Sequence, residues 1–189
     1  RAAEAHLLAT FNAAELARNS APQDRSTAID RYLALIEEHL AQWPSAPSTD
    51  QVYWWLGNLR EAQKQWPEAM SAYRTIRPNQ PQSEAASQAV LRCCQHLLSQ
   101  PNVTAKLKHQ WVQEAVNYLY RSVLGPEGRW PDSWSSHQRH CAVAVARMLL
   151  HRTGRGHAPA EQILAAALSG SPTPRAEWAS EARALLLVS

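Results

Sequence analysis

The sequence has few of the residues and patterns that mark several large classes of protein. It contains a single Phe, six Gly and three Cys, and none of its apolar runs is long enough to cross a bilayer. It has no glycine-rich phosphate loop and no nucleophile elbow, and no stretch alternates apolar and polar residues with period two. These absences argue against a β-sheet fold, a familiar nucleotide or hydrolase site, and a membrane span within this chain.

Strong charge of either sign is also missing. The chain carries 19 basic and 16 acidic residues, which gives a formal net charge of +3. The Lys and Arg residues are scattered among acids and form no patch of the density that a phosphate backbone requires. Nucleic acid is therefore not an expected partner.

The cysteines give no disulfide framework. Cys93 and Cys94 are neighbours within an apolar helical pattern, Cys141 stands alone, and an odd count leaves at least one thiol free. Free Cys is among the residue types most often buried. We expect three small buried side chains and no cofactor attached through them.

What the sequence does have is helical periodicity over nearly its whole length. Apolar residues recur at intervals of three and four, and Pro, Gly and Asn residues interrupt the pattern between segments. Thr49 is the expected N-cap of the third helix, and Asp132 or Ser133 that of the seventh. The pattern predicts an all-α chain of about nine helices, at residues 2–18, 24–42, 50–65, 67–78, 83–99, 103–124, 133–150, 159–168 and 175–187.

One segment carries a recognisable repeat. Tyr53-Trp54-Trp55-Leu56-Gly57 is followed by Ala69, Tyr73 and Pro81. This resembles the tetratricopeptide repeat, in which an aromatic precedes a Leu-Gly pair, a small residue lies at the helix crossing, and Pro closes a unit of about 34 residues. Arg60 and Ile76 depart from the family pattern. Ala28, Tyr32 and Leu35 repeat the spacing of Ala69, Tyr73 and Ile76, as in the closing helix of an earlier unit.

The resemblance implies a fold as well as a repeat. It predicts a right-handed superhelix of antiparallel helical hairpins, an α-solenoid, with repeat-like hairpins in residues 1–100 and diverged hairpins or a capping segment in residues 101–189. The bend of the array is expected in the loop at residues 125–131. Trp55, Leu56, Ala69 and Tyr73 are the predicted core of the best hairpin.

A looser similarity concerns residues 24–98. Pro-x-Ser turns before the next helix, together with Trp66-Pro67-Glu68-Ala69, resemble the repeat style of bacterial cell-envelope assembly proteins. This similarity favours a periplasmic or envelope location over a cytoplasmic one, and the sequence leaves the location open.

The family binds its ligands on the concave face, which the first helix of each unit forms. In this sequence the corresponding positions are Gln51, Trp54, Asn58, Glu61, Gln88, Arg92, Gln95 and His96. Amide and guanidinium groups can bond an extended peptide while Trp54 anchors it. A polar outward face that only keeps the helices soluble explains the same residues. The carboxylate-clamp form of the family is not expected, because only Asn58 and Arg92 are candidates for it.

One cluster has residue types that bind metals. His137, His140 and Cys141 are three or four residues apart and share a helix face, so two of them could serve as zinc ligands. A site would need further donors, such as His151 or His157. An amphipathic helix with its Cys toward the core explains the same residues, and no metal is predicted.

These observations predict a non-enzymatic module for protein–protein interaction or assembly, with a protein or peptide segment as its partner. A helical accessory domain of a larger enzyme, in particular a carbohydrate-active one, is the alternative. Self-association through a Trp-rich surface is a third reading, since the chain holds eight Trp.

Overall fold

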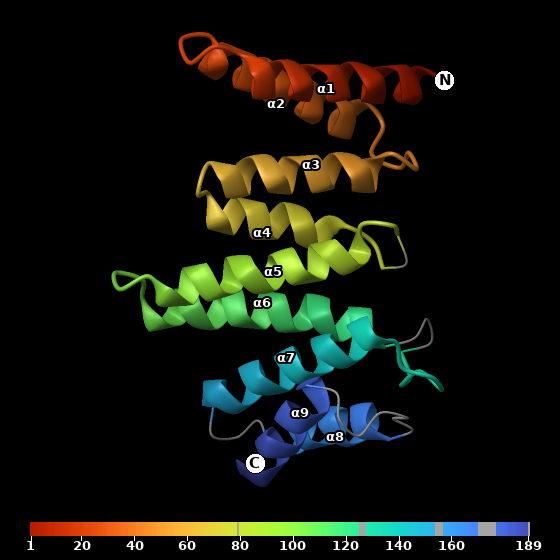
Figure 1. The fold of residues 1–189 in the computed structure, drawn as a ribbon, viewed down its shortest axis with the longest axis vertical. Helices are drawn as coiled ribbons and strands as arrows, with labels where there is room; N and C mark the ends of the chain where they lie inside the picture. The colour runs from red at the N-terminus through yellow and green to blue at the C-terminus, as the bar shows by residue number, and fades with distance from the viewer. Residues whose placement is uncertain (79, 125–127, 154–156, 170–176, 189) are drawn as a thin grey trace. The chain divides into compact units, whose positions relative to one another are not determined.

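The computed structural model describes residues 1–78, 80–124, 128–153, 157–169 and 177–188. Within these ranges the chain forms nine α-helices and no β-strand (Figure 1), which confirms the all-helical prediction and the expected number of helices. The helices are α1 (Ala2–Asn19), α2 (Arg25–Gln42), α3 (Thr49–Ala62), α4 (Trp66–Thr75), α5 (Ser83–Ser99), α6 (Ala105–Val123), α7 (Ser136–Thr153), α8 (His157–Leu168) and α9 (Glu177–Val188).

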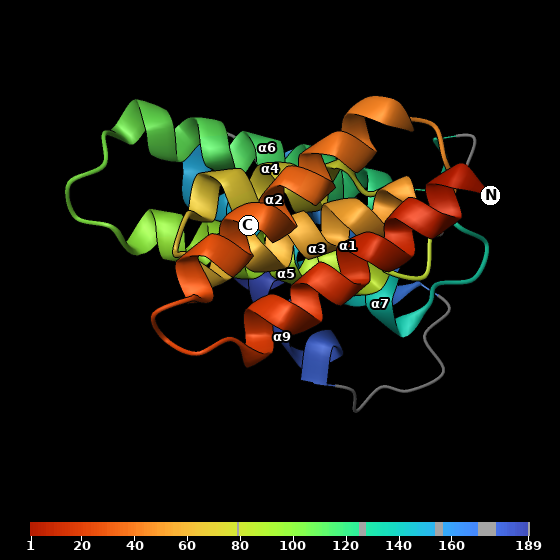
Figure 2. The same cartoon turned by 90° about the horizontal axis from the view of Figure 1, so that it is seen from above.

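The helices belong to two compact units, Arg1–Gln82 and Ser83–Ser189. In the first unit α1 packs on α2 and α3 packs on α4, with a smaller contact between α2 and α3. Figures 1 and 2 show α1 and α2 running in opposite directions, as expected of a helical hairpin. The buried core of this unit includes Ala13, Tyr32, Ile36 and Val52, with Trp55 and Leu56 packed partly buried against it.

The hairpin of α3 and α4 is built around one aromatic ring. Ala69 and Tyr73 of α4 are fully buried, as the repeat spacing predicts. A Cβ atom added to Gly57 of α3 would lie 2.4 to 2.8 Å from three ring atoms of Tyr73. Only glycine therefore lets the two helices approach this closely.

An ion pair between buried Asp50 and the exposed Arg77 closes the same hairpin. The carboxylate of Asp50, in the first turn of α3, accepts hydrogen bonds from the backbone N–H of Arg77 at 2.9 Å and from its guanidinium at 2.9 and 2.5 Å. This hydrogen bonding with Asp50 raises the pKa of Arg77 above its usual range. Three donors on one carboxylate fix the segment after α4 against the start of α3.

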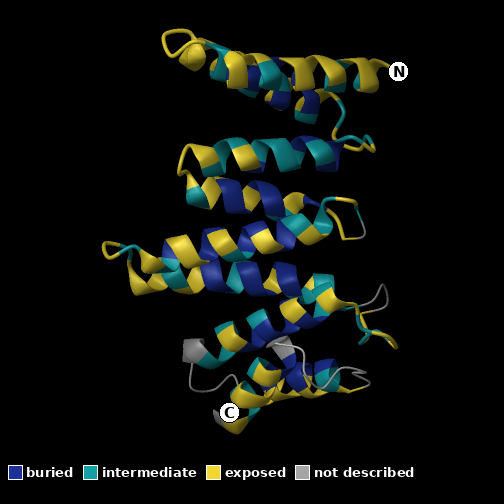
Figure 3. Ribbon diagram, viewed as in Figure 1, coloured by how far each residue is buried: buried dark blue, intermediate teal, exposed yellow. Residues whose placement is uncertain are grey.

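In the second unit α6 packs between α5 and α7, α7 packs on α8, and α9 contacts both α7 and α8. The buried residues lie mainly where the helices of each unit face one another (Figure 3). On α5 these are Ala86, Ser87, Ala89, Val90, Cys93, Cys94 and Leu97. Direct contact between α5 and α7 is small, which leaves space between these two helices.

Several predicted helix ends were wrong by a few residues. Ser48, not Thr49, is the N-cap of α3, and the Thr49 hydroxyl instead donates to the carbonyl oxygen of Trp43 at 2.9 Å. The sixth helix begins at Ala105 after Thr104, whose hydroxyl accepts the backbone N–H of Leu107 at 3.3 Å.

The seventh helix begins later than Asp132 or Ser133 would place it. The Ser135 hydroxyl accepts the backbone N–H of Gln138 at 3.1 Å, and the Gln138 side chain accepts the backbone N–H of Ser135 at 3.0 Å. This reciprocal pair is a capping box, and it starts α7 at Ser136.

Parts of the sequence-based predictions fall outside the described residues. Residues 125–127 of the predicted bend belong there, as do residues 154–156 and the start of the predicted ninth helix at residues 175–176. Among the described helices, none combines the length and apolar character that crossing a bilayer requires.

Candidate functional site

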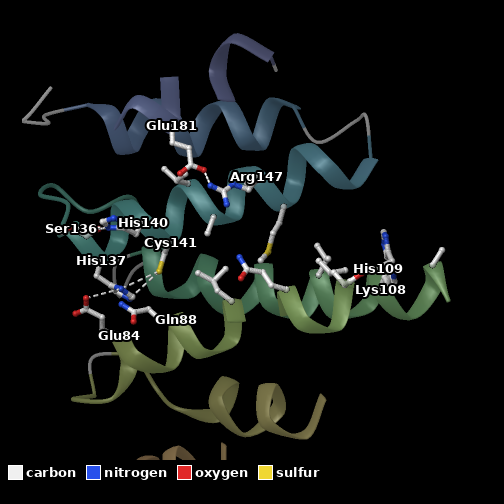
Figure 4. A pocket seen from close by; sticks show the side chains of 18 residues that line it. Glu84, Gln88, Lys108, His109, Ser136, His137, His140, Cys141, Arg147 and Glu181 are labelled. Atoms are coloured by element: carbon white, nitrogen blue, oxygen red, sulfur yellow. Dashed lines mark hydrogen bonds and ion pairs between the residues drawn. The ribbon is translucent and has the colours of Figure 1, made fainter. Parts of the chain in front are cut away.

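A groove of about 850 Å³ opens between α5 and α7 in the second unit (Figure 4). α6 contributes to its wall, and α9 contributes Glu181. A volume of this size lies within the range of ligand pockets in proteins. Its apolar lining consists mainly of Leu91, Leu98, Val112, Val143, Ala144 and Met148.

The groove-facing side of α5 is one regular stripe. Glu84, Gln88, Leu91, Gln95 and Leu98 follow one another at spacings of four and three residues and all line the groove. This spacing keeps them on one side of the helix, while the opposite side packs into the core. The sequence of α5 thus supplies one core face and one face for the groove.

At the N-terminal end of α5 the groove holds a polar cluster (Figure 4). Glu84 Oε1 lies 3.7 Å from His137 Nδ1, and His137 Nε2 lies 3.5 Å from the Cys141 sulfur. A thiol that donates to Nε2 leaves the ring proton on Nδ1, facing Glu84, so one tautomer satisfies both contacts. α5 and α7 are therefore linked here by a chain of three side chains.

Burial makes the side chains of this cluster unreactive, because it favours the neutral forms of His137 and Cys141. Desolvation lowers the pKa of His137, although Glu84 opposes the shift, so the ring is neutral at neutral pH. Desolvation also raises the pKa of the Cys141 thiol to about 12. The thiolate is the nucleophilic form of cysteine, so a thiol with this pKa is a poor nucleophile.

The arrangement of His137, His140 and Cys141 gives little support to a metal site. His137 and Cys141 are neighbours, but His140 directs its Nδ1 to the backbone carbonyl oxygen of Ser136 at 2.7 Å. The side chains of His151 and His157 lie outside the described residues. Within the described part of the chain, no group of three or more His, Cys, Asp or Glu side chains is arranged to hold a metal ion.

The other end of the groove is basic. Lys108 of α6 donates from Nζ to the carbonyl oxygen of Leu98 at 2.8 Å, which holds its ammonium at the C-terminal end of α5. His109 lies beside it in the groove lining. Arg147 of α7 forms an ion pair with Glu181 of α9, so these two charges compensate one another (Figure 4).

The predicted binding residues of α3 lie in the first unit and gather around Tyr73. The ring of Trp54 lies 5.2 Å from that of Tyr73, and the Tyr73 hydroxyl lies 2.8 Å from Asn58 Oδ1 and 2.7 Å from Glu61 Oε2. Gln51 accepts a hydrogen bond from Gln82. These side chains are engaged within their own unit, and their contact with a partner remains a prediction.

The predicted residues of α5 divide into two groups. Gln88 and Gln95 line the groove, whereas Arg92 and His96 are exposed on α5 and do not belong to its lining. Sequence reasoning missed the contribution of α7. A signal was present, since His137, Cys141, Ala144 and Met148 follow the same four-three-four spacing as the stripe on α5.

A second polar cluster, also missed, lies in the first unit between α1, α2 and the start of α3. His39 is fully buried, with Nδ1 3.3 Å from His6 Nδ1 and Nε2 2.9 Å from the Ser48 hydroxyl. Trp43 packs on both imidazole rings, with centroids 5.0 and 5.3 Å away. Burial, and then the neighbouring His6, lower the pKa of His39.

Comparison with known proteins leaves the groove as the main guide to function. No family model, no curated protein and no solved structure matches this chain. A function must therefore be inferred from the chemistry of the residues themselves.

Proposed function

We propose that the protein is a non-enzymatic interaction module that binds a peptide segment of a partner protein in the groove between α5 and α7. The observation that carries this proposal is the groove itself, with an apolar lining and two amide side chains, Gln88 and Gln95, along one wall. Apolar contacts supply affinity in such sites, and amides can hydrogen-bond an extended peptide backbone.

The chemistry of the groove favours binding over catalysis. Cys141 carries a protonated thiol whose pKa is raised to about 12, and His137 beside it is neutral and partnered. The resemblance of residues 53–81 to a tetratricopeptide repeat supports the same reading, since that family presents partner segments on the first helix of each hairpin. α5 is the first helix of such a pair in the second unit.

The proposal is tested by capture from a lysate with three forms of the chain. Leu91→Gln introduces a polar amide into the groove, and Leu107→Gln makes the same exchange at an exposed position of α6 outside the lining. Overlapping peptides of each captured protein are then titrated against all three forms. We expect one peptide to bind the parent and Leu107→Gln alike, and Leu91→Gln at least about five-fold more weakly. Equal binding by all three forms would mean that the peptide does not bind in the groove.

A second candidate function, an accessory domain of a carbohydrate-active enzyme, is favoured by one aromatic cluster. The rings of Trp130 and Trp134 stack with centroids 5.8 Å apart, Tyr120 meets Trp130 edge-on at 5.7 Å, and all three side chains are half-buried. Flat aromatic faces also bind sugar rings. Quenching of Trp fluorescence by cellohexaose or chitohexaose, abolished in Trp130→Ala, would support this function over the first.

A further inference from the structure

The groove carries two charges that the protein itself does not compensate, one at each end. At the first end, the only basic neighbour of the Glu84 carboxylate among the described residues is His137, and that ring is neutral at neutral pH. The Glu84 side chain is 64% exposed, so its charge faces the groove and the solvent. A cationic group on a ligand would meet a carboxylate whose one described partner, His137, is neutral.

At the second end, Lys108 is held in place by a neutral acceptor. Its ammonium donates to the Leu98 carbonyl oxygen at 2.8 Å, and it makes no ion pair in the described part of the chain. An ammonium carries three donors, so two remain for another group. A carboxylate on a ligand would therefore meet a positioned positive charge.

Between the two ends the wall is electrically balanced and mostly apolar. Arg147 is paired with Glu181, Leu91 lies between Glu84 and Leu98 on α5, and Val112 and Met148 add further apolar lining. Glu84 and Leu98 are 14 residues apart on α5, which corresponds to about 21 Å at about 1.5 Å per residue. An extended peptide spans this length in about six residues.

We propose that the groove is selective for an extended peptide segment of defined charge polarity. Such a segment carries a basic residue at the Glu84 end, an acidic residue or terminal carboxylate at the Lys108 end, and apolar residues between them. This inference rests on the proposed function and names the chemistry of its ligand. Charge complementarity of this kind fixes the register and direction of a bound segment.

The polarity is tested with a phage-displayed library of random dodecapeptides selected against the full chain. We expect the enriched peptides to share a basic and an acidic residue about six positions apart, in one consistent order, with apolar residues between. Selection against the double variant Glu84→Lys with Lys108→Glu should enrich the opposite order. Selection against the Leu91→Gln variant, whose groove lining carries a polar amide, is the negative control.

The selected peptide is then synthesised and titrated against single variants by fluorescence anisotropy. Glu84→Gln and Lys108→Gln should each weaken binding about two- to five-fold, the effect of a partly exposed ion pair, while Lys106→Gln on the exposed side of α6 should leave the Kd unchanged. Raised salt should weaken binding to the parent, and it should weaken binding less for a variant that combines Glu84→Gln with Lys108→Gln.

The possible failures are distinguishable. If selection on the parent enriches no peptide that selection on the Leu91→Gln variant does not also enrich, both the polarity and the proposed function are wrong. If the parent enriches apolar peptides with no charge pattern, or if the double variant enriches the same order, the groove binds peptides but the inferred polarity is wrong.

Discussion

Gly57 and Tyr73 show at the scale of single residues how the repeat pattern becomes structure. The sequence placed a glycine and an aromatic at the offsets of a helix crossing, and the Tyr73 ring occupies the space that a Cβ atom on Gly57 would need. The hydroxyl of the same ring reaches Asn58 and Glu61. The spacing predicted the buried ring, but it could not predict that two expected binding residues would be partners of its hydroxyl.

Gly57→Ala should therefore destabilise the protein. The added methyl group would overlap ring atoms of Tyr73, and overpacking of this kind typically costs about 1 to 3 kcal/mol. The measurement is the free energy of unfolding by urea, with Ser71→Ala on the exposed side of α4 as a control. A Gly57→Ala protein as stable as the parent would mean that the ring and helix α3 are further apart than described.

The pair of buried His39 and partly buried His6 gives a prediction about pH. Because burial and His6 lower the pKa of His39 in the folded state, unfolding allows His39 to take up a proton. Stability from this residue is thus complete above the ordinary pKa of about 6.5 and is lost as the pH falls below it. Two facing Nδ1 atoms at 3.3 Å can also share only one proton.

Urea unfolding between about pH 8 and about pH 5 measures this effect. We expect the parent to lose stability over the acidic half of that range, and His39→Gln, which cannot be charged, to lose less. Glu38 faces His6, and Thr10, Trp43 and Ser48 complete the surroundings of the pair. Parallel pH profiles for the two proteins would contradict this role for His39.

At the scale of elements, the sequence predicted which segments are helical better than it predicted where they start. Four polar residues, Asp132, Ser133, Ser135 and Ser136, precede or open α7, and each is a residue type that caps helices. Ser135 is the N-cap because Gln138 follows three positions later, and the side chain of Gln138 accepts the backbone N–H of Ser135 in return. That spacing is visible in the sequence and would have identified the cap.

The cap supports a direct comparison of two serines. Ser135→Ala removes the acceptor for the Gln138 N–H and should lower the free energy of unfolding by about 1 kcal/mol. Ser133→Ala, two residues earlier and exposed, should change it by less than about 0.5 kcal/mol. If Ser133→Ala proves the more damaging change, the start of α7 is misplaced.

At the scale of the whole molecule, the periodicity of the sequence predicted the all-helical class but could not predict the groove. The sequence divided the chain near residue 100, where the repeat offsets fade, but the compact units divide between Gln82 and Ser83, so that α5 belongs to the second unit. The groove depends on α6 lying between α5 and α7. Periodicity within one helix indicates which side chains share a face, and it carries no information about the width of a gap between two helices.

The most direct test of the central claim, that a partner peptide lies between α5 and α7, is photocrosslinking. A benzophenone amino acid replaces Gln88, which lines the groove, or Gln110, which lies on the exposed surface of α6. Each protein is irradiated with the peptide enriched by the parent chain, and the attached residue is identified by mass spectrometry. The account predicts crosslinking from position 88 at one or two adjacent peptide positions, and little from position 110. Equal crosslinking from both positions, or crosslinking from position 110 alone, would contradict it.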